Sequence, residues 1–174
     1  MAGVAVRLIC LALFAGAVFA YLGVLPAIKQ QLLGKSSDFA EIVFADLPHQ
    51  DILISFGGGP QDNPPDGCSI AVVSLNETAA PAPPRPDATR PKGYQFGGLW
   101  RKTPLPQTAP HFRDLLDTCR SSFDKNTLRS LREAMALPGA YVIRSWTGNE
   151  LEIYAPEAVI AAKLRYGPPP KLSP

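Results

Sequence analysis

Residues 68–75 read CSIAVVSL, a short apolar run bounded on both sides by glycine- and proline-rich stretches. β-Branched side chains favour strands, and glycine and proline mark where strands end. Ile70 and Val72 alternate with Ala71 and Val73, so both faces of such a strand are apolar. We therefore expect residues 68–75 to form a central strand that is covered on both sides.

Other short runs upstream and downstream have a similar composition. Phe39–Ala45 and Asp51–Phe56 are predicted strands, and Tyr94–Trp100 is a weaker strand candidate with a Gly-Gly bend. The loop 57–67 (GGGPQDNPPDG) is predicted to be a turn rather than a phosphate-binding loop, because its prolines leave no helix N-terminus to receive an anion. Residues 78–92 (TAAPAPPRPDATRPK) predict an extended excursion, because proline interrupts both helices and sheets.

Two amphipathic helices are expected next. The first has an apolar stripe at helical spacing, made of Phe112, Leu115, Leu116, Cys119 and Phe123. The second begins near Asp124 or Asn126, which are good helix caps, and ends at Pro138-Gly139. Its inward side chains are expected to be Leu128, Leu131 and Met135.

A β-hairpin is predicted around Gly148-Asn149, a pair typical of two-residue turns. Its strands are expected at Tyr141–Trp146 and Glu150–Tyr154, with Trp146 opposite Leu151. The same pairing puts Arg144 opposite Ile153. The core face would then consist of Val142, Trp146, Leu151 and Ile153.

A last helix is predicted from Pro156 to Gly167. Proline suits the first helical turn, Lys163 and Arg165 suit the last turn, and Gly167 suits the cap. Because the strands and helices are segregated rather than alternating, we expect an α+β fold with a mainly antiparallel sheet and about three helices, following an N-terminal transmembrane helix. The expected organisation is a short tail at 1–7, a transmembrane helix at 8–28, a juxtamembrane linker at 29–38, one domain at 39–167 with the proline-rich excursion at 78–92, and a disordered tail at 168–174.

Residues 8–28 (LICLALFAGAVFAYLGVLPAI) carry no charge over 21 positions. As a helix this stretch would be about 31 Å long, close to the ~30 Å hydrocarbon core of a bilayer. It predicts a signal anchor that holds the chain in a membrane. A cleaved signal peptide remains an alternative, because small residues precede possible cleavage sites after Ala17 and Ala20.

The cysteines decide the expected orientation, because the basic residues on either side of the apolar stretch are nearly balanced. Cys68 and Cys119 are the only cysteines after the apolar stretch, and such a pair predicts a disulfide in an oxidising compartment. The alternative is a pair of buried thiols in a cytosolic domain. We expect an inner-membrane protein with its domain in the periplasm or an equivalent exported compartment.

Several function classes lack support in the sequence. The chain of 174 residues has a net charge of +2, and after residue 28 it holds 16 basic against 15 acidic residues, so no nucleic-acid partner is expected. No zinc, calcium or cofactor motif occurs, and none of these groups is expected. The acidic pairs Asp114/Asp117 and Glu150/Glu152 are interpreted as solvated surface charges. No catalytic residue is predicted, although an enzyme is not excluded.

One segment suggests a binding surface, because basic and aromatic residues alternate along it. These residues are Arg85, Arg90, Lys92, Tyr94, Trp100, Arg101 and Lys102. They are predicted to contact a protein partner; in the alternative interpretation the segment is solvated and its aromatic rings fold into the core.

The leading hypothesis is therefore a non-enzymatic accessory or scaffolding subunit of an envelope or membrane complex, anchored through residues 8–28. A periplasmic small-ligand-binding domain is the first alternative, with a pocket formed by Trp100, Tyr141 and Trp146. The second is a small hydrolase that uses His49 or His111.

Overall fold

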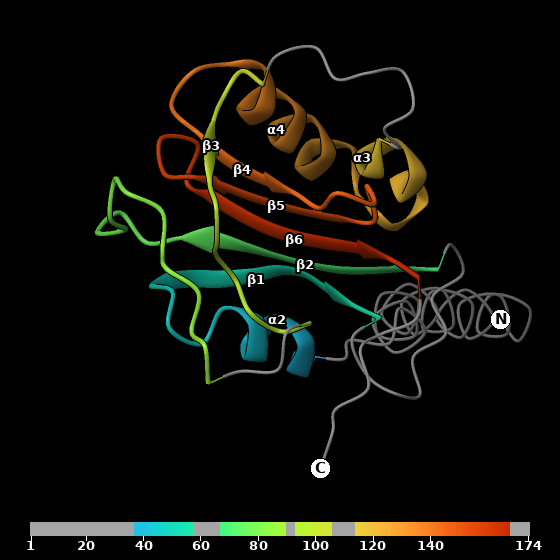
Figure 1. The fold of residues 1–174 in the computed structure, drawn as a ribbon, viewed down its shortest axis with the longest axis horizontal. Coiled ribbons are helices and arrows are strands. Elements are labelled where there is room, and N and C mark those ends of the chain that lie inside the picture. The colour runs from blue at the N-terminus through green and yellow to red at the C-terminus, as the bar shows by residue number, and fades with distance from the viewer. Residues whose placement is uncertain (1–36, 58–66, 90–92, 106–113, 168–174) are drawn as a thin grey trace, which may run out of the picture. The chain divides into compact units, whose positions relative to one another are not determined.

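A computed structural model describes residues 37–57, 67–89, 93–105 and 114–167. These residues form an α+β domain around a six-stranded sheet, in which every neighbouring pair of strands is antiparallel (Figure 1). The strand order is β1-β2-β6-β5-β4-β3. The strands are β1 (His49–Phe56), β2 (Cys68–Leu75), β3 (Arg101–Lys102), β4 (Tyr141–Arg144), β5 (Glu150–Ala155) and β6 (Ile160–Tyr166).

Helices cover both faces of this sheet. The helices α3 (Leu115–Thr118) and α4 (Lys125–Ala136) lie on one face, with the 3-10 turn η1 (Arg120–Ser122) between them in the chain, and α2 (Ser37–Val43) lies on the other face (Figure 1). No helix within the described ranges is both long and apolar enough to cross a membrane. The predicted anchor at 8–28 lies outside those ranges, as do the tails at 1–7 and 168–174 and most of the linker at 29–38.

Strand β2 confirms the prediction for residues 68–75, including both ends. Ile70 and Val72 belong to the core under α3 and α4, whereas Ala71 and Val73 belong to the core on the α2 side. All four side chains are fully buried. A strand with two apolar faces is stable only between two covering layers, and β2 has the α3–α4 layer on one face and α2 on the other.

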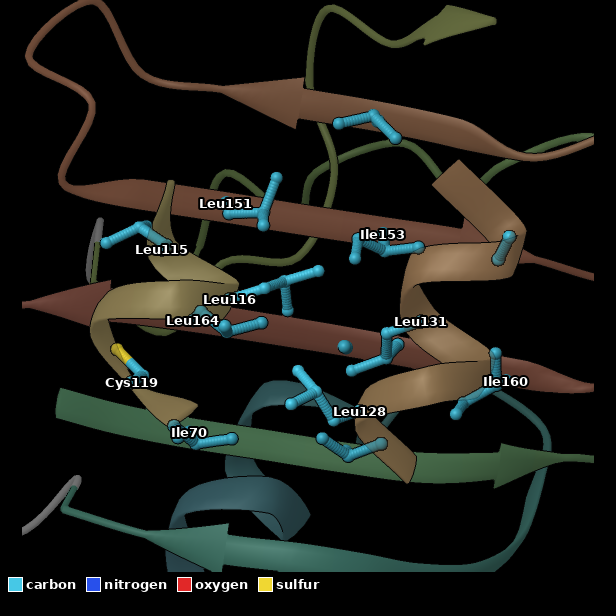
Figure 2. Close-up of a cluster of buried hydrophobic side chains, with 14 of the residues drawn as sticks. Ile70, Leu115, Leu116, Cys119, Leu128, Leu131, Leu151, Ile153, Ile160 and Leu164 are labelled. Atoms are coloured by element: carbon cyan, nitrogen blue, oxygen red, sulfur yellow. The ribbon is translucent and has the colours of Figure 1, made fainter. Parts of the chain in front are cut away.

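The helix-side core joins α3 and α4 to the sheet. Leu115, Leu116 and Cys119 point towards the sheet from one helical segment, and Leu128 and Leu131 do so from the other (Figure 2). Burying each leucine contributes roughly 1.5–3 kcal/mol, so this stripe accounts for much of what holds the helices in place. The two predicted helical stripes are thus confirmed in the described residues, although α3 is shorter than expected and Phe112 lies outside the described ranges.

The predicted strand at 39–45 is wrong, because Ser37–Val43 forms α2. Phe39, Ala40, Val43 and Phe44 are buried together, and their spacing of three to four residues places them on one side of a helix. Exposed Glu41 lies between them. A segment of only seven residues is too short for its apolar periodicity to separate helix from strand.

The predicted strand at 94–100 is also wrong, since only Arg101 and Lys102 form a strand there. Gly97 and Gly98 have φ values of +124° and +153°, a region that other residues rarely adopt. The chain therefore leaves the extended conformation at this point and crosses the α2 side of the sheet.

The C-terminal helix predicted at 156–167 is wrong as well. Pro156 begins a tight turn, in which the Val159 N–H donates to the Pro156 carbonyl, and residues 160–166 form β6 between β2 and β5. Alanine and lysine favour helices locally. However, the alternating side chains of β6 are buried on both faces of the sheet, and this tertiary burial outweighs the local preference.

The predicted hairpin is present, but its first strand ends at Arg144 rather than at Trp146 and its pairing differs from the prediction. Arg144 pairs with Leu151 rather than with Ile153, because residues 146–149 form a longer loop. The Ser145 hydroxyl accepts from the Glu150 N–H and donates to the Asn149 side chain, and these bonds stabilise the loop. Trp146 is therefore in the loop and is 93% exposed, not in the core.

Candidate partner-binding surface

Cys68 and Cys119 are joined by a disulfide in the structure, with their Cα atoms 5.8 Å apart. Cys68 is the first residue of β2, and Cys119 is the C-terminal cap of α3. Both are completely buried. The bridge fixes the end of α3 to the start of β2, and it leaves neither sulfur as a free nucleophile.

The aromatic residues of the segment 85–102 point inward. Tyr94 is only 2% exposed and meets Phe39 of α2 edge to face, with ring centroids 5.8 Å apart. Trp100 packs against Phe96 at 5.4 Å, and its Nε1–H donates to the Pro84 carbonyl at 2.8 Å. Tyr94 is thus part of the core rather than of a contact surface.

The basic residues of the same segment have a different environment. Arg85, Arg101 and Lys102 are exposed, whereas Arg90 and Lys92 lie outside the described ranges. Arg101 and Lys102 form all of β3, the strand at one edge of the sheet. Charged side chains on a short edge strand hinder pairing with another sheet. The five predicted residues that the structure describes do not form one exposed surface, because Tyr94 is buried in the core.

A buried ion pair holds the loop in front of β3 against the sheet. Lys163 of β6 and Glu152 of β5 are directly opposite each other, with Nζ 2.5 Å from Oε1. Lys163 also donates to the Gln95 carbonyl at 2.6 Å, and Glu152 Oε2 accepts from the Gly97 N–H at 2.7 Å. The two charges therefore attach the irregular segment 95–97 to two strands.

The interpretation of Glu152 as a solvated surface charge is wrong, because its residue exposure is 6%. Burial raises the pKa of the Glu152 carboxyl above its ordinary value, while the ammonium of Lys163 acts in the opposite direction. Glu150 is less buried and pairs with Arg165 at 3.2 Å. Of the other acidic pair, Asp114 caps α3, and Asp117 lies at the surface.

A group of four exposed cations lies elsewhere, around a groove between the α3–η1 segment and α4. This α4 groove has a volume of about 770 Å³, and its charged lining consists of Arg120, Lys125, Arg129, Arg132, Asp117 and Glu133. Arg132 forms an ion pair with Asp117 across the groove. Phe123 and Leu128 add apolar surface.

The α4 groove was not predicted from the sequence, although one signal for it is present. Lys125, Arg129 and Arg132 are four and three residues apart, so they lie on one side of a helix. The contribution of Arg120 could not be recognised in this way, because it comes from a separate element that only the tertiary structure brings alongside α4.

The residues considered for the two alternative functions are not assembled into a site in the described ranges. His49 is the first residue of β1, and its Nδ1 lies 2.8 Å from the Leu47 carbonyl; His111 lies outside the described ranges. Tyr141 and Trp100 both pack near Tyr154, but Trp146 is exposed in the β4–β5 loop. Among the described residues, no cluster of three or more His, Cys, Asp or Glu side chains is placed to hold a metal ion.

Neither a protein-family model, nor a curated protein, nor a solved structure matches this chain.

Proposed function

We propose that this chain is a membrane-anchored accessory or scaffolding subunit of an envelope complex, with its α+β domain on the extracytoplasmic side and without a catalytic role. The observation that carries the proposal is the buried Cys68–Cys119 bridge. Disulfides form and persist in oxidising compartments, so the bridge supports an exported domain. The uncharged stretch at 8–28 has the length of a membrane span and supports a permanent tether.

A tether makes such a domain suited to binding. Confinement to the membrane raises the effective concentration of the domain towards partners in the same membrane. The α4 groove has four cations and two carboxylates in its lining, and it contains neither a histidine nor a cysteine. This chemistry supports recognition of a partner more than it supports catalysis.

Reporter fusions in a bacterial host test the location. Alkaline phosphatase fused after Lys35 is expected to be active, because it acquires its own disulfides only after export. A matched fusion of a reporter that is active only in the cytosol, made at the same residue, is expected to be inactive. The opposite pair of results would overturn the proposed orientation.

Two measurements on the unfused chain test the anchor and the role. The full-length chain is expected in the membrane fraction, and it is expected to migrate faster on a denaturing gel without reductant than with it. A shortened chain in the soluble extract would contradict the anchor. Native mass measurement after mild detergent extraction is expected to show a complex with another protein, whereas a lone monomer would contradict the accessory role.

A further inference from the structure

We propose that the α4 groove binds an extended, acidic segment of a protein partner, with carboxylate side chains held by Arg120, Lys125 and Arg129. This proposal rests on the proposed function in that it names the chemistry of the partner. Two independent features of the structure carry it: the arrangement of the cations and the rigidity of the two walls.

The lining of the groove has four cations and two carboxylates, and three of the cations form no ion pair within the described residues. Asp117 on one wall already pairs with Arg132 on the other, so one of the four cations is neutralised by the groove itself. Within the described residues, Arg120 and Lys125 have no ion-pair partner, and the Arg129 side chain donates a hydrogen bond to the neutral Asn126 side chain, at 3.3 Å. Guanidinium groups suit carboxylates in particular, because they offer two parallel N–H donors.

The spacing of these cations fits an extended chain. Lys125 and Arg129 are four residues apart on α4, which corresponds to about 6 Å along the helix axis. In an extended peptide, alternate side chains point the same way and lie about 6.6 Å apart. Acidic residues at alternate positions of a bound segment would therefore match successive cations of α4.

The walls of the groove are fixed before a partner arrives. Arg120 directly follows Cys119, whose disulfide joins it to β2. Lys125 begins α4 directly after Asp124, whose carboxylate accepts from the N–H groups of Asn126 and Thr127. A site that is already rigid loses less conformational entropy on binding than a flexible one, which increases affinity.

The shape of the site favours a peptide over a lipid surface. The cations surround a hollow with Phe123 and Leu128 in its lining, and a flat layer of headgroups does not reach into a hollow. A peptide segment does, and one apolar side chain of the segment would contact the half-buried Phe123 ring. We therefore assign the groove to a protein segment that combines carboxylates with an apolar residue.

The test uses the full-length chain in nanodiscs of zwitterionic lipid and a fluorescent peptide with glutamate at alternate positions and one central leucine. Fluorescence anisotropy is expected to show binding that weakens as salt is added. The same peptide with glutamine in place of each glutamate is expected not to bind. The paired change Arg120→Gln and Arg129→Gln is expected to weaken binding by about tenfold or more, because it removes two charge-assisted contacts.

A matched variant, Arg101→Gln with Lys102→Gln, removes the same charge from the edge strand β3 and is expected to bind normally. Circular dichroism checks that both variants fold, and folding is expected because all four side chains are exposed. Equal binding of the glutamate and glutamine peptides, or an equal loss in the β3 variant, would overturn the proposal. Binding to vesicles that contain phosphatidylglycerol, without binding to the peptide, would overturn it too. The reporter fusions test the proposed location, and the peptide assay tests the α4 groove. A failure of one proposal can therefore be distinguished from a failure of the other.

Discussion

Lys163 and Glu152 face each other across β6 and β5 with Nζ and Oε1 2.5 Å apart, and both are almost completely buried. The two strands are already joined by backbone hydrogen bonds, so the pair adds little to that connection. Through the Gln95 carbonyl and the Gly97 N–H it also fixes the loop that covers the α2 side of the sheet.

The change Lys163→Met is expected to lower the free energy of unfolding by about 3–5 kcal/mol, because it leaves the Glu152 carboxylate buried without its counter-charge. Adding Glu152→Gln to this variant removes the uncompensated charge and keeps an acceptor for the Gly97 N–H. The double variant is therefore expected to recover about 2 kcal/mol. Urea denaturation of the natural chain, the two single variants Lys163→Met and Glu152→Gln, and the double variant measures the coupling. Strictly additive losses would contradict a buried ion pair.

The change Gly97→Ala is expected to destabilise the domain by at least about 1 kcal/mol more than Gly167→Ala. Both glycines have positive φ values, +124° and +108°, so both substitutions strain the backbone. At Gly97 the added Cβ would also lie 2.8 Å from the Pro84 carbonyl oxygen, whereas at Gly167 nothing lies within 4 Å. Thermal denaturation compares the two variants, and equal losses would show that the crowding at Gly97 has no effect.

The paired change Cys68→Ala and Cys119→Ala is expected to lower the free energy of unfolding by about 4 kcal/mol. The bridge closes a loop between residues 51 apart, and in the chain-entropy model this restricts the unfolded chain by that amount. Urea denaturation with and without reductant measures the effect. Reductant is expected to lower the stability of the natural chain and to leave that of the variant unchanged; an effect of reductant on both would point to another cause.

The Asp124 carboxylate is expected to make the stability depend on pH through the cap of α4. Hydrogen bonds from Thr127, first from its side chain and then from its backbone N–H, lower the pKa of Asp124 below its ordinary value of 3.8. The folded state thus binds this proton less tightly than the unfolded chain does. The resulting stabilisation is present above pH 3.8 and is lost as the pH falls through the lower folded-state value.

Two substitutions separate the charge of Asp124 from its capping role. Asp124→Ala is expected to cost about 1 kcal/mol at pH 7, because two N–H groups of the first helical turn lose their acceptor. Asp124→Asn keeps a capping oxygen but does not titrate, so the natural chain is expected to lose stability relative to it on acidification. Chemical denaturation between pH 2 and pH 7 checks this, and parallel curves for the two proteins would contradict the expected linkage.

Comparison of the predicted and observed elements shows where local patterns were sufficient. The strands at 51–56 and 68–75 and the helix after Asp124 were predicted correctly, because their apolar patterns and their end signals agree. The segments 39–45 and 156–167 were assigned to the wrong type of element. The first segment is short and the second is rich in alanine, so each sequence is compatible with both a helix and a strand. Which one forms depends on how its apolar side chains are buried against the rest of the domain.

The predicted binding segment 85–102 also shows that a local pattern does not reveal which side chains are buried by distant parts of the chain. Basic and aromatic residues alternate between Arg85 and Lys102, but Tyr94 and Trp100 pack against rings from distant parts of the chain. The α4 groove combines cations from two elements that are held side by side by the disulfide and the helix-side core. Such a juxtaposition has no sequence signature, because it depends on contacts between separated segments.

The sequence by itself determined the α+β class, the central strand with two apolar faces and the amphipathic α4, and it named Cys68 and Cys119 as candidates for a disulfide. Each of these follows from local periodicity or from a count of side chains. Only the tertiary structure decided that residues 160–166 form a strand, that Lys163 and Glu152 are buried as a pair, and that Arg120 joins the cations of α4. The physical reason is that burial and ion pairing depend on neighbours across the sheet, which local sequence does not specify.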